Sequence, residues 1–270
     1  MLFTIGQEPQ VTEKPQPDSP KTAKARAELK QIYRLFLGSA LAMRQGYFEF
    51  PTDMVEDVGN KKWRQTGRVK LWRMSSEHFR AEVNVTGRSI NGKSRLRRPE
   101  RYTVVCDGKF VVTADEYRKV YCRQTPAEFQ KEDDQLATGI LFIMMEPVVS
   151  AFLTEFGGDG KGGADEVLDK IEKNIDKLSG FDVGIRRMQM QLEKRGNLSV
   201  LAIDGGNGVT FLEIPTGKNR ISRFSLVGDG GKYTETIERM ESRALPESLF
   251  RASAPAGFRQ VKDIKIIQKT

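Results

Sequence analysis

The chain has 270 residues, of which 38% are hydrophobic and 30% are charged. This composition is typical of a soluble globular protein and argues against both wholesale disorder and a membrane-embedded fold. The 44 basic and 36 acidic residues leave a formal net charge of +8. Such a charge permits attraction to phosphate, nucleic acid or anionic lipid headgroups, but does not choose among them. A chain of this length can bury a substantial core in one domain.

The N-terminal residues predict a tether that leads into a helix. Residues 1–22 contain Pro9, Pro15, Pro17 and Pro20 among charged and polar residues, which indicates an extended Pro-rich linker. No continuous apolar run follows Met1. Taken alone this favours the cytoplasm, although a mature terminus left by signal removal has the same appearance. From Ser19, apolar residues recur at helical spacing and predict an amphipathic helix: Ala25, Leu29, Ile32, Phe36, Ala40 and Met43.

A first β block is predicted from Tyr47 to Arg123. Its clearest strand alternates apolar and polar residues from His78 to Val85. Asp107-Gly108 provides turn chemistry for a hairpin, and Val120-Tyr121-Cys122 returns as a third strand. Cys106 and Cys122 would then lie on the two outer strands of this meander, about 10 Å apart, which predicts two free thiols rather than a disulfide.

The segment from Pro126 to Leu178 has helical character. An apolar helix is expected near Leu136 to Phe156 and an amphipathic one near Ala164 to Leu178, with the glycine-rich connector 157–163 between them. Within the longest apolar run, Gly139 to Phe156, Glu146, Pro147 and Glu155 interrupt a stretch that is already short for crossing a bilayer. A buried or half-buried helix is therefore expected.

A second β block follows, with glycine-rich turns between its segments. Its predicted strands are 188–192, 198–203, 209–214, 220–227 and 232–240. Two β blocks around a helical segment predict an α+β fold, in which one large antiparallel sheet is curved around or covered by helices. The expected organisation is a tether over 1–22 and a single domain over 23–270, with a helical insertion near 126–187.

The sequence favours binding over catalysis. His78 is the only histidine and falls on the polar face of its predicted strand, which leaves little with which to build a catalytic triad or a histidine-rich metal site. The glycine-rich run around Lys161 lacks the Ser or Thr of a phosphate-binding loop. Neither a metal nor a cofactor is predicted.

The densest basic cluster lies between two predicted strands. It contains Lys93, Arg95, Arg97, Arg98 and Arg101 together with Gly92 and Pro99, which predicts a loop. A solvated loop is the simplest interpretation. Contact with an anionic membrane surface through Arg95, Arg97 and Arg98, or with nucleic acid, are the alternatives.

Three motifs, in their order along the chain, resemble the LolA/LolB-like lipoprotein-carrier superfamily. They are Lys70-Leu71-Trp72 followed by Phe79 to Val83, then Cys106-Asp107-Gly108-Lys109-Phe110, then the terminal segment from Leu245 to Phe258 with its Leu-Pro, Leu-Phe and Pro-x-Gly steps. The resemblance spans roughly residues 25 to 262. The chain departs from the family in its long insertion from Pro126 to Arg187 and in lacking an N-terminal lipobox cysteine.

The resemblance implies a half-open antiparallel β-barrel, with helices acting as a lid or plug over an apolar cavity that holds acyl chains. It also implies a lipid or an acylated protein as partner, and a periplasmic or otherwise extracytoplasmic location. Because the apolar helix has more apolar surface than one face requires, its apolar residues either line this cavity or fill an ordinary core. The candidate residues are Leu141, Phe142, Met144, Met145, Val148, Phe152 and Leu153.

Two other functions stay open at this stage. The domain could be a protein-interaction or envelope sensor domain without a lipid cargo, because the same fold serves several roles. An anionic-surface or nucleic-acid binding module is less favoured. An apolar cavity would support the carrier, a continuous basic stripe with stackable aromatic residues would support nucleic-acid binding, and a filled barrel with an exposed apolar patch would support protein interaction.

Overall fold

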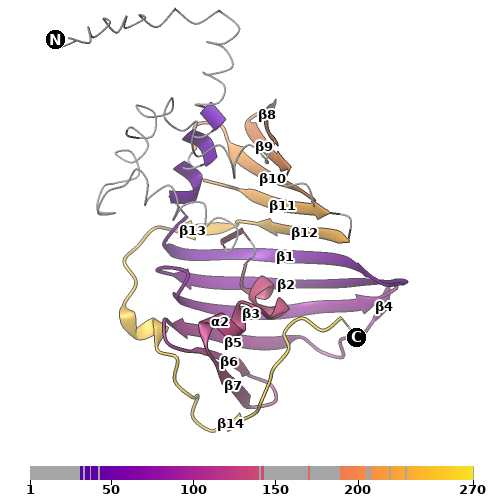
Figure 1. The fold of residues 1–270 in the computed structure, drawn as a ribbon, viewed down its shortest axis with the longest axis vertical. Coiled ribbons are helices and arrows are strands. Elements are labelled where there is room, and N and C mark those ends of the chain that lie inside the picture. Colours follow the sequence, from indigo (N-terminus) through magenta and orange to yellow (C-terminus); the bar gives the residue numbers. More distant parts are fainter. Residues whose placement is uncertain are drawn as a thin grey trace, which may run out of the picture.

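The computed structural model describes residues 31–32, 34–36, 38–41, 43–139, 141–142, 170, 189–204, 208–218, 220–228 and 230–269. Their dominant feature is one 14-stranded sheet in the order β14-β7-β6-β5-β3-β2-β1-β12-β11-β10-β9-β8, with β13 paired to β1 and β4 paired to β3. The strand pairs are antiparallel except β14 with β7, and the sheet does not close on itself (Figure 1). The predicted large antiparallel sheet is confirmed.

The N-terminal half of the sheet is a meander. Its elements are β1 (Gly46–Val58), β2 (Lys61–Arg73), β3 (His78–Ile90), β4 (Lys93–Ser94), β5 (Glu100–Asp107), β6 (Val111–Asp115) and β7 (Val120–Gln124), followed by α2 (Pro126–Phe129) and the 3₁₀ helix η1 (Asp133–Thr138). The Asp107-Gly108 hairpin forms as predicted. Gly108 has a φ of 82°, and the Asp107 side chain accepts hydrogen bonds from the N–H groups of Lys109 and Phe110.

The C-terminal half continues the same sheet from the other side of β1. Its elements are β8 (Gln189–Arg195), β9 (Leu198–Asp204), β10 (Gly208–Pro215), β11 (Arg223–Gly228), β12 (Gly231–Thr236), β13 (Arg239–Glu241), the 3₁₀ helix η3 (Glu247–Phe250) and β14 (Arg259–Gln260). β12 pairs with β1 through Met54↔Tyr233 and joins the two β blocks.

Two predicted strands of this half have different limits. The strand expected from Arg220 begins at Arg223. The strand expected over 232–240 divides into β12 and β13, both paired to β1. Four steps from Glu235 to Arg239 oppose three steps from Thr52 to Glu49, so the extra residue interrupts the ladder in the manner of a β-bulge.

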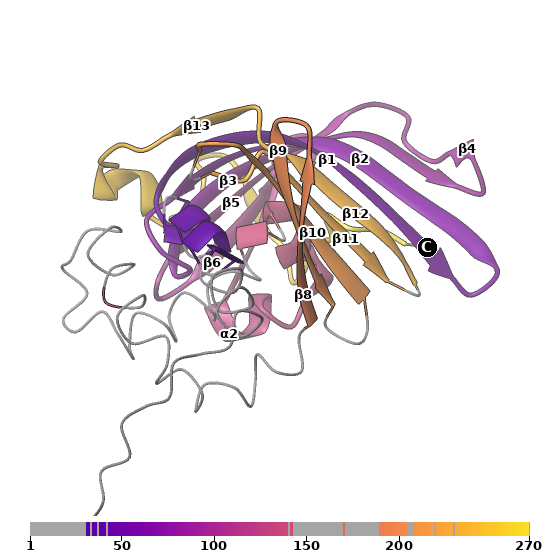
Figure 2. The same cartoon turned by 90° about the horizontal axis from the view of Figure 1, so that it is seen from above.

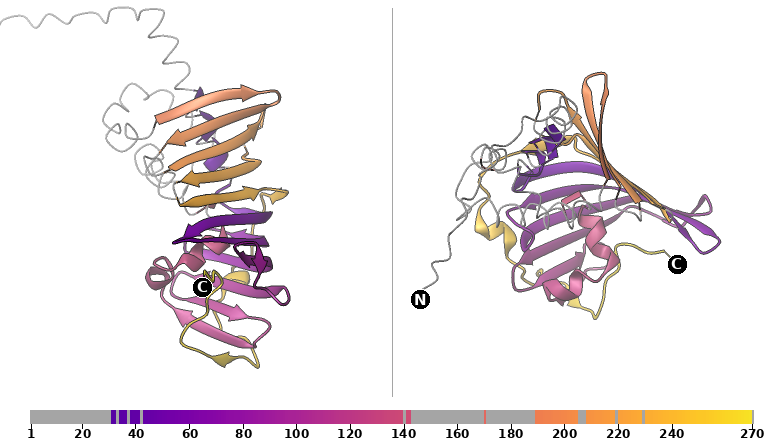
Figure 3. Two further views of the ribbon diagram at one scale, coloured as in Figure 1. Left: turned by 90° about the vertical axis from the view of Figure 1, so that its right-hand side faces the viewer. Right: turned by 45° about the horizontal axis from the view of Figure 1, so that its top comes forward.

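The sheet is strongly curved, and its concave face carries the core. Figures 2 and 3 show it arching over the helical residues between 31 and 41 and over α2. The alternation predicted for β3 is confirmed, since Phe79, Ala81, Val83 and Val85 are buried while the residues between them are partly exposed. The helical residues and the turn after them contribute Ile32, Phe36, Ala40 and Met43 to the same buried core, as their spacing predicted.

The predicted start of the apolar helix, near Leu136, is wrong. Residues 133–138 form the 3₁₀ helix η1, and Gly139 with a φ of 123° separates it from the helical residues 141–142. A Cβ at Gly139 would lie 3.0 Å from the Phe142 ring and 3.1 Å from the Phe50 ring, so a residue without a side chain is required there. Residues 143–156 of the expected helix, and the tether over 1–22, lie outside the described residues.

In the part of the chain that the structure describes, we find no helix that combines the length and the apolar character needed to cross a membrane.

Candidate functional site

The concave face of the sheet holds a hollow of about 510 Å³ beneath α2 and η1. Ligand pockets in proteins commonly have volumes of about 300–1,000 Å³, so this hollow is large enough for a small apolar molecule. Its described lining consists of Leu71, Arg73, Ser76, Phe79, Cys106, Val111, Pro126, Phe129, Gln130, Gln135, Thr138, Gly139 and Phe142.

The floor of the hollow is one row of side chains across four neighbouring strands. Arg73 of β2 is paired with Phe79 of β3, Phe79 with Cys106 of β5, and Cys106 with Val111 of β6. Paired residues of adjacent strands point to the same side of a sheet, so these four side chains share the concave face. Cys106 contributes an uncharged thiol, because burial raises its pKa.

The roof comes from the segment that follows β7. Thr125 caps α2 in a capping box with Glu128, which fixes the direction of the short helix. The ring of Phe129 then lies 6.3 Å from that of Phe79. Phe142 packs on Phe48 with ring centroids 4.7 Å apart. The roof is therefore held to the sheet by aromatic contacts on two sides of the hollow.

Arg73 is the one charged side chain of the described lining. It is 6% exposed, its Nε donates to the backbone oxygen of Arg44 at 3.2 Å, and its guanidinium carbon lies 5.9 Å from the centre of the Phe142 ring. Because the other described lining residues are uncharged, Arg73 gives the hollow one cationic end.

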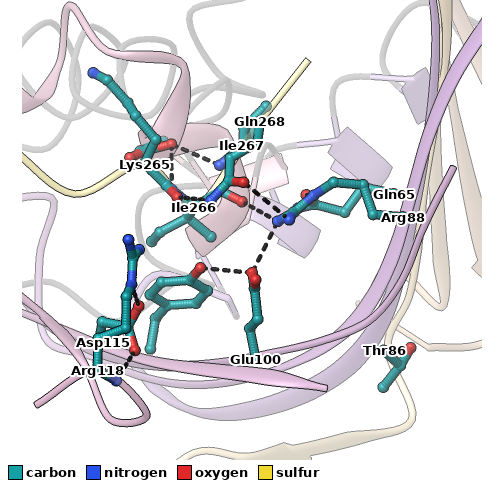
Figure 4. Close-up of polar contacts among 12 residues, drawn as sticks. Gln65, Thr86, Arg88, Glu100, Asp115, Arg118, Lys265, Ile266, Ile267 and Gln268 are labelled. Carbon is teal, nitrogen blue, oxygen red and sulfur yellow. Dashed lines mark hydrogen bonds and ion pairs between the residues drawn. The ribbon is translucent and has the colours of Figure 1, made fainter. Parts of the chain in front are cut away.

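The C-terminal segment, residues 247–269, passes around the edge of the sheet, and its last residues lie on the concave face beside the hollow. η3 packs on β3 and β5. The Ala252 N–H donates a hydrogen bond to the Asp107 carboxylate, which lies on the outward face of β5. β14 then pairs with β7 at the edge. Ile264, Ile266 and Ile267 are buried in the core, and Figure 4 shows Ile266 and Ile267 on the concave side.

Arg88 links the C-terminal segment to the sheet through hydrogen bonds. A bulge at Thr86 shifts the register between β2 and β3 and turns Arg88 to the concave face, where it is buried. Its guanidinium donates to the side chains of Gln65, Glu100 and Gln268 and to the backbone oxygen of Ile266 (Figure 4).

Two further groups hold the same segment. The Asp134 carboxylate accepts hydrogen bonds from the N–H groups of Ile266 and Ile267 at 3.0 and 2.8 Å. The indole Nε1 of Trp63 donates to the backbone oxygen of Gln268 at 2.7 Å. Ile267 and Trp63 also line a second hollow of about 270 Å³ between η1 and β12. The segment is therefore held on the concave face by hydrogen bonds to β2, β3 and η1.

The sequence-predicted lining residues fall partly within the described chain. Leu141 and Phe142 are buried, and Phe142 lines the larger hollow. Met144, Met145, Val148, Phe152 and Leu153 lie outside the described residues. The C-terminal contribution was not predicted, although Ile264, Ile266 and Ile267 are apolar residues in a basic tail.

The predicted basic loop joins β4 to β5, and Arg95, Arg97 and Arg98 are exposed in it. His78 is half-buried at the start of β3, with its Nδ1 3.4 Å from the Ser75 hydroxyl oxygen. Among the described residues, no group of three or more His, Cys, Asp or Glu side chains could hold a metal ion.

These features define a class of structure, a large open antiparallel sheet with an apolar hollow on its concave face. No protein-family model matches the sequence, and no curated protein matches it. Among solved structures, the chain is similar to the crystal structure of LprF from Mycobacterium bovis at 12% identity, with 86% of this chain and 98% of that chain covered and a TM-score of 0.38. The LolA/LolB-like resemblance stays a prediction.

Proposed function

We propose that the protein binds an apolar, lipid-like ligand in the concave hollow and carries it without chemical change. The observation that supports this most is the row of Phe79, Cys106 and Val111 beneath Phe129 and Phe142, which lines a hollow of about 510 Å³ whose described walls are uncharged apart from Arg73 at one end. Burying one methylene group contributes about 0.8 kcal/mol. A hollow that takes several methylenes of an acyl chain would therefore bind it with useful affinity.

In this proposal the sheet is a half-open barrel, and the helical segment from Leu141 onward is its lid. Phe142 supplies the described part of the roof. Met144, Met145, Val148, Phe152 and Leu153 would continue the apolar lining, and Glu146-Pro147 would kink the lid because proline removes a helical hydrogen bond. Lipoprotein acyl chains are the cargo that the superfamily resemblance suggests, in an extracytoplasmic compartment.

Native mass spectrometry before and after delipidation, followed by titration with a fluorescent fatty acid, tests the proposal. Ser76 is a half-buried turn residue on the rim of the hollow, so Ser76→Trp should fill space at little cost to folding. If the indole excludes two methylene groups, binding should weaken about tenfold or more. Ser253→Trp is the matched control, because Ser253 is exposed and does not line the hollow.

Phe142→Asp gives a second variant, to be measured together with circular dichroism and thermal melting. The variant removes the aromatic roof and places a carboxylate at the hollow near the Arg73 guanidinium, so uptake of an apolar chain should fall. The melting curve will show how far the substitution destabilises the fold. The proposal fails if the parent protein carries no lipid and binds no fatty acid, or if Ser76→Trp binds the probe as the parent does.

A further inference from the structure

The outward face of the sheet carries a third hollow, a basic groove of about 960 Å³. Six cationic side chains line it, namely Arg68, Lys70, Arg80, Arg98, Arg101 and Lys119, against two acidic ones, Glu82 and Glu116. The groove lies on the opposite side of β2, β3 and β5 from the apolar hollow, so the two hollows share no side chain.

Two rows of side chains across three strands form the floor of the basic groove. One row runs from Arg68 through Asn84 to Arg101, and the next contains Lys70, Glu82 and Thr103. Adjacent strands are about 4.8 Å apart, so the backbones at the two ends of a row are about 10 Å apart.

The wall of the basic groove is formed by two loops that contact each other through Arg98 and Tyr117. The guanidinium of Arg98, in the loop after β4, lies 2.9 Å from the centre of the Tyr117 ring in the β6–β7 turn. The Thr103 hydroxyl donates to the Glu116 carboxylate at 3.1 Å. Tyr117 is 49% exposed. The cationic group of Arg98 is thus held in place by a ring rather than by a carboxylate.

The charges in the basic groove are only partly compensated. Arg68 pairs with Glu49 and Glu238, and Arg80 pairs with Glu82. Lys70 and Arg101 form no ion pair with the described residues.

Between Arg68 and Arg101, the buried side-chain oxygen of Asn84 has no hydrogen-bond partner in the described part of the chain. An unpartnered buried acceptor costs free energy. A ligand that has a hydroxyl group next to its anionic group could donate a hydrogen bond to the Asn84 side-chain oxygen.

We propose that the basic groove binds a phosphate ester whose neighbouring hydroxyl group reaches Asn84. Lys70, Arg98 and Arg101 supply the uncompensated positive charge, and guanidinium groups suit phosphate because they donate paired hydrogen bonds. Two sources share this chemistry, the headgroup of an anionic phospholipid and a soluble phosphate ester. With a headgroup bound, the exposed Arg95 and Arg97 of the adjoining loop would face the membrane surface.

The test uses the full chain with Lys70 and Arg101 both replaced by Ser. The matched control replaces Lys194 and Lys218, two exposed lysines that do not line the groove, and loses the same charge. The probes are phosphatidylcholine vesicles with and without phosphatidylglycerol, glycerol 3-phosphate in solution, and a single-stranded oligonucleotide. Melting curves establish that all variants are folded.

We expect Lys70→Ser/Arg101→Ser to weaken phosphate-ester binding about tenfold or more, since each basic residue near an anionic surface contributes severalfold to binding, while the control binds as the parent. Loss of binding to phosphatidylglycerol vesicles identifies a headgroup, and loss of binding to glycerol 3-phosphate alone identifies a soluble ester. The proposal is overturned if the parent binds neither, if both double variants weaken binding equally, or if the oligonucleotide binds more tightly than either phosphate probe.

Discussion

Replacement of Asp134 by Asn tests how the C-terminal segment is held. The Asp134 side chain is 4% exposed and accepts hydrogen bonds from the N–H groups of Ile266 and Ile267. Burial is the largest cause that raises the pKa of this carboxyl from 3.8 to about 6, against the lowering effect of those two hydrogen bonds. Asn keeps an oxygen that can accept both bonds and removes the charge.

The sign of the pH effect follows from proton binding in the two states. Between about pH 4 and pH 6, the folded protein keeps a proton on Asp134 that the unfolded chain has released, so this group's contribution to stability is lost as the pH rises. The rise from 3.8 to about 6 corresponds to about 3 kcal/mol. Relative to the parent, Asp134→Asn should therefore gain about 3 kcal/mol in free energy of unfolding between pH 4 and pH 7.

Urea unfolding across this pH range, followed by tryptophan fluorescence, measures the difference. Trp63 reports on the segment itself, because its indole N–H donates to Gln268. Asp133→Asn is the control. Its side chain is 60% exposed and pairs with Lys269, so the variant should change stability by less than about 1 kcal/mol. A difference between Asp134→Asn and the parent that stays constant with pH would refute the reasoning.

Three further predictions follow from buried groups. Gly139→Ala should lower the free energy of unfolding by about 1–3 kcal/mol, because φ is 123° and the added Cβ would press on two phenylalanine rings; an unchanged thermal melt would contradict this. Cys106 and Cys122 are buried and unbonded, and burial raises the pKa of both thiols. Thiol titration should therefore find two groups in denaturant and slow reaction in the folded protein, whereas finding none in denaturant would exclude free thiols. Trp63→Phe removes the hydrogen bond to Gln268 and should cost about 1 kcal/mol in chemical denaturation; equal stability of variant and parent would show that this bond contributes nothing net.

The local features of the fold could be predicted from the sequence because short-range chemistry decides them. Alternating burial in β3 follows from the two-residue period of its side chains. Asp107-Gly108 forms its turn through the aspartate side chain and the positive φ of the glycine. The meander of β5, β6 and β7 then places Cys106 and Cys122 on strands separated by β6, as expected.

The site depends on contacts that the sequence pattern does not encode. A bulge at Thr86 turns Arg88 to the concave face, where its partners come from the far end of the chain. The tail around Ile266 lacks a strand or helix period, yet it is buried by partners far away in the sequence.

By itself, then, the sequence determined strands such as β3, β5 and β7, the Asp107-Gly108 turn and the antiparallel class, because periodicity and turn chemistry act over a few residues. The tertiary structure alone decided that β12 pairs with β1, that Arg73, Phe79, Cys106 and Val111 form one row, and that the C-terminal segment fills the concave face beside them. The physical reason is that these arrangements are set by strand register and by the burial of distant apolar side chains against one another, and neither leaves a local pattern in the chain.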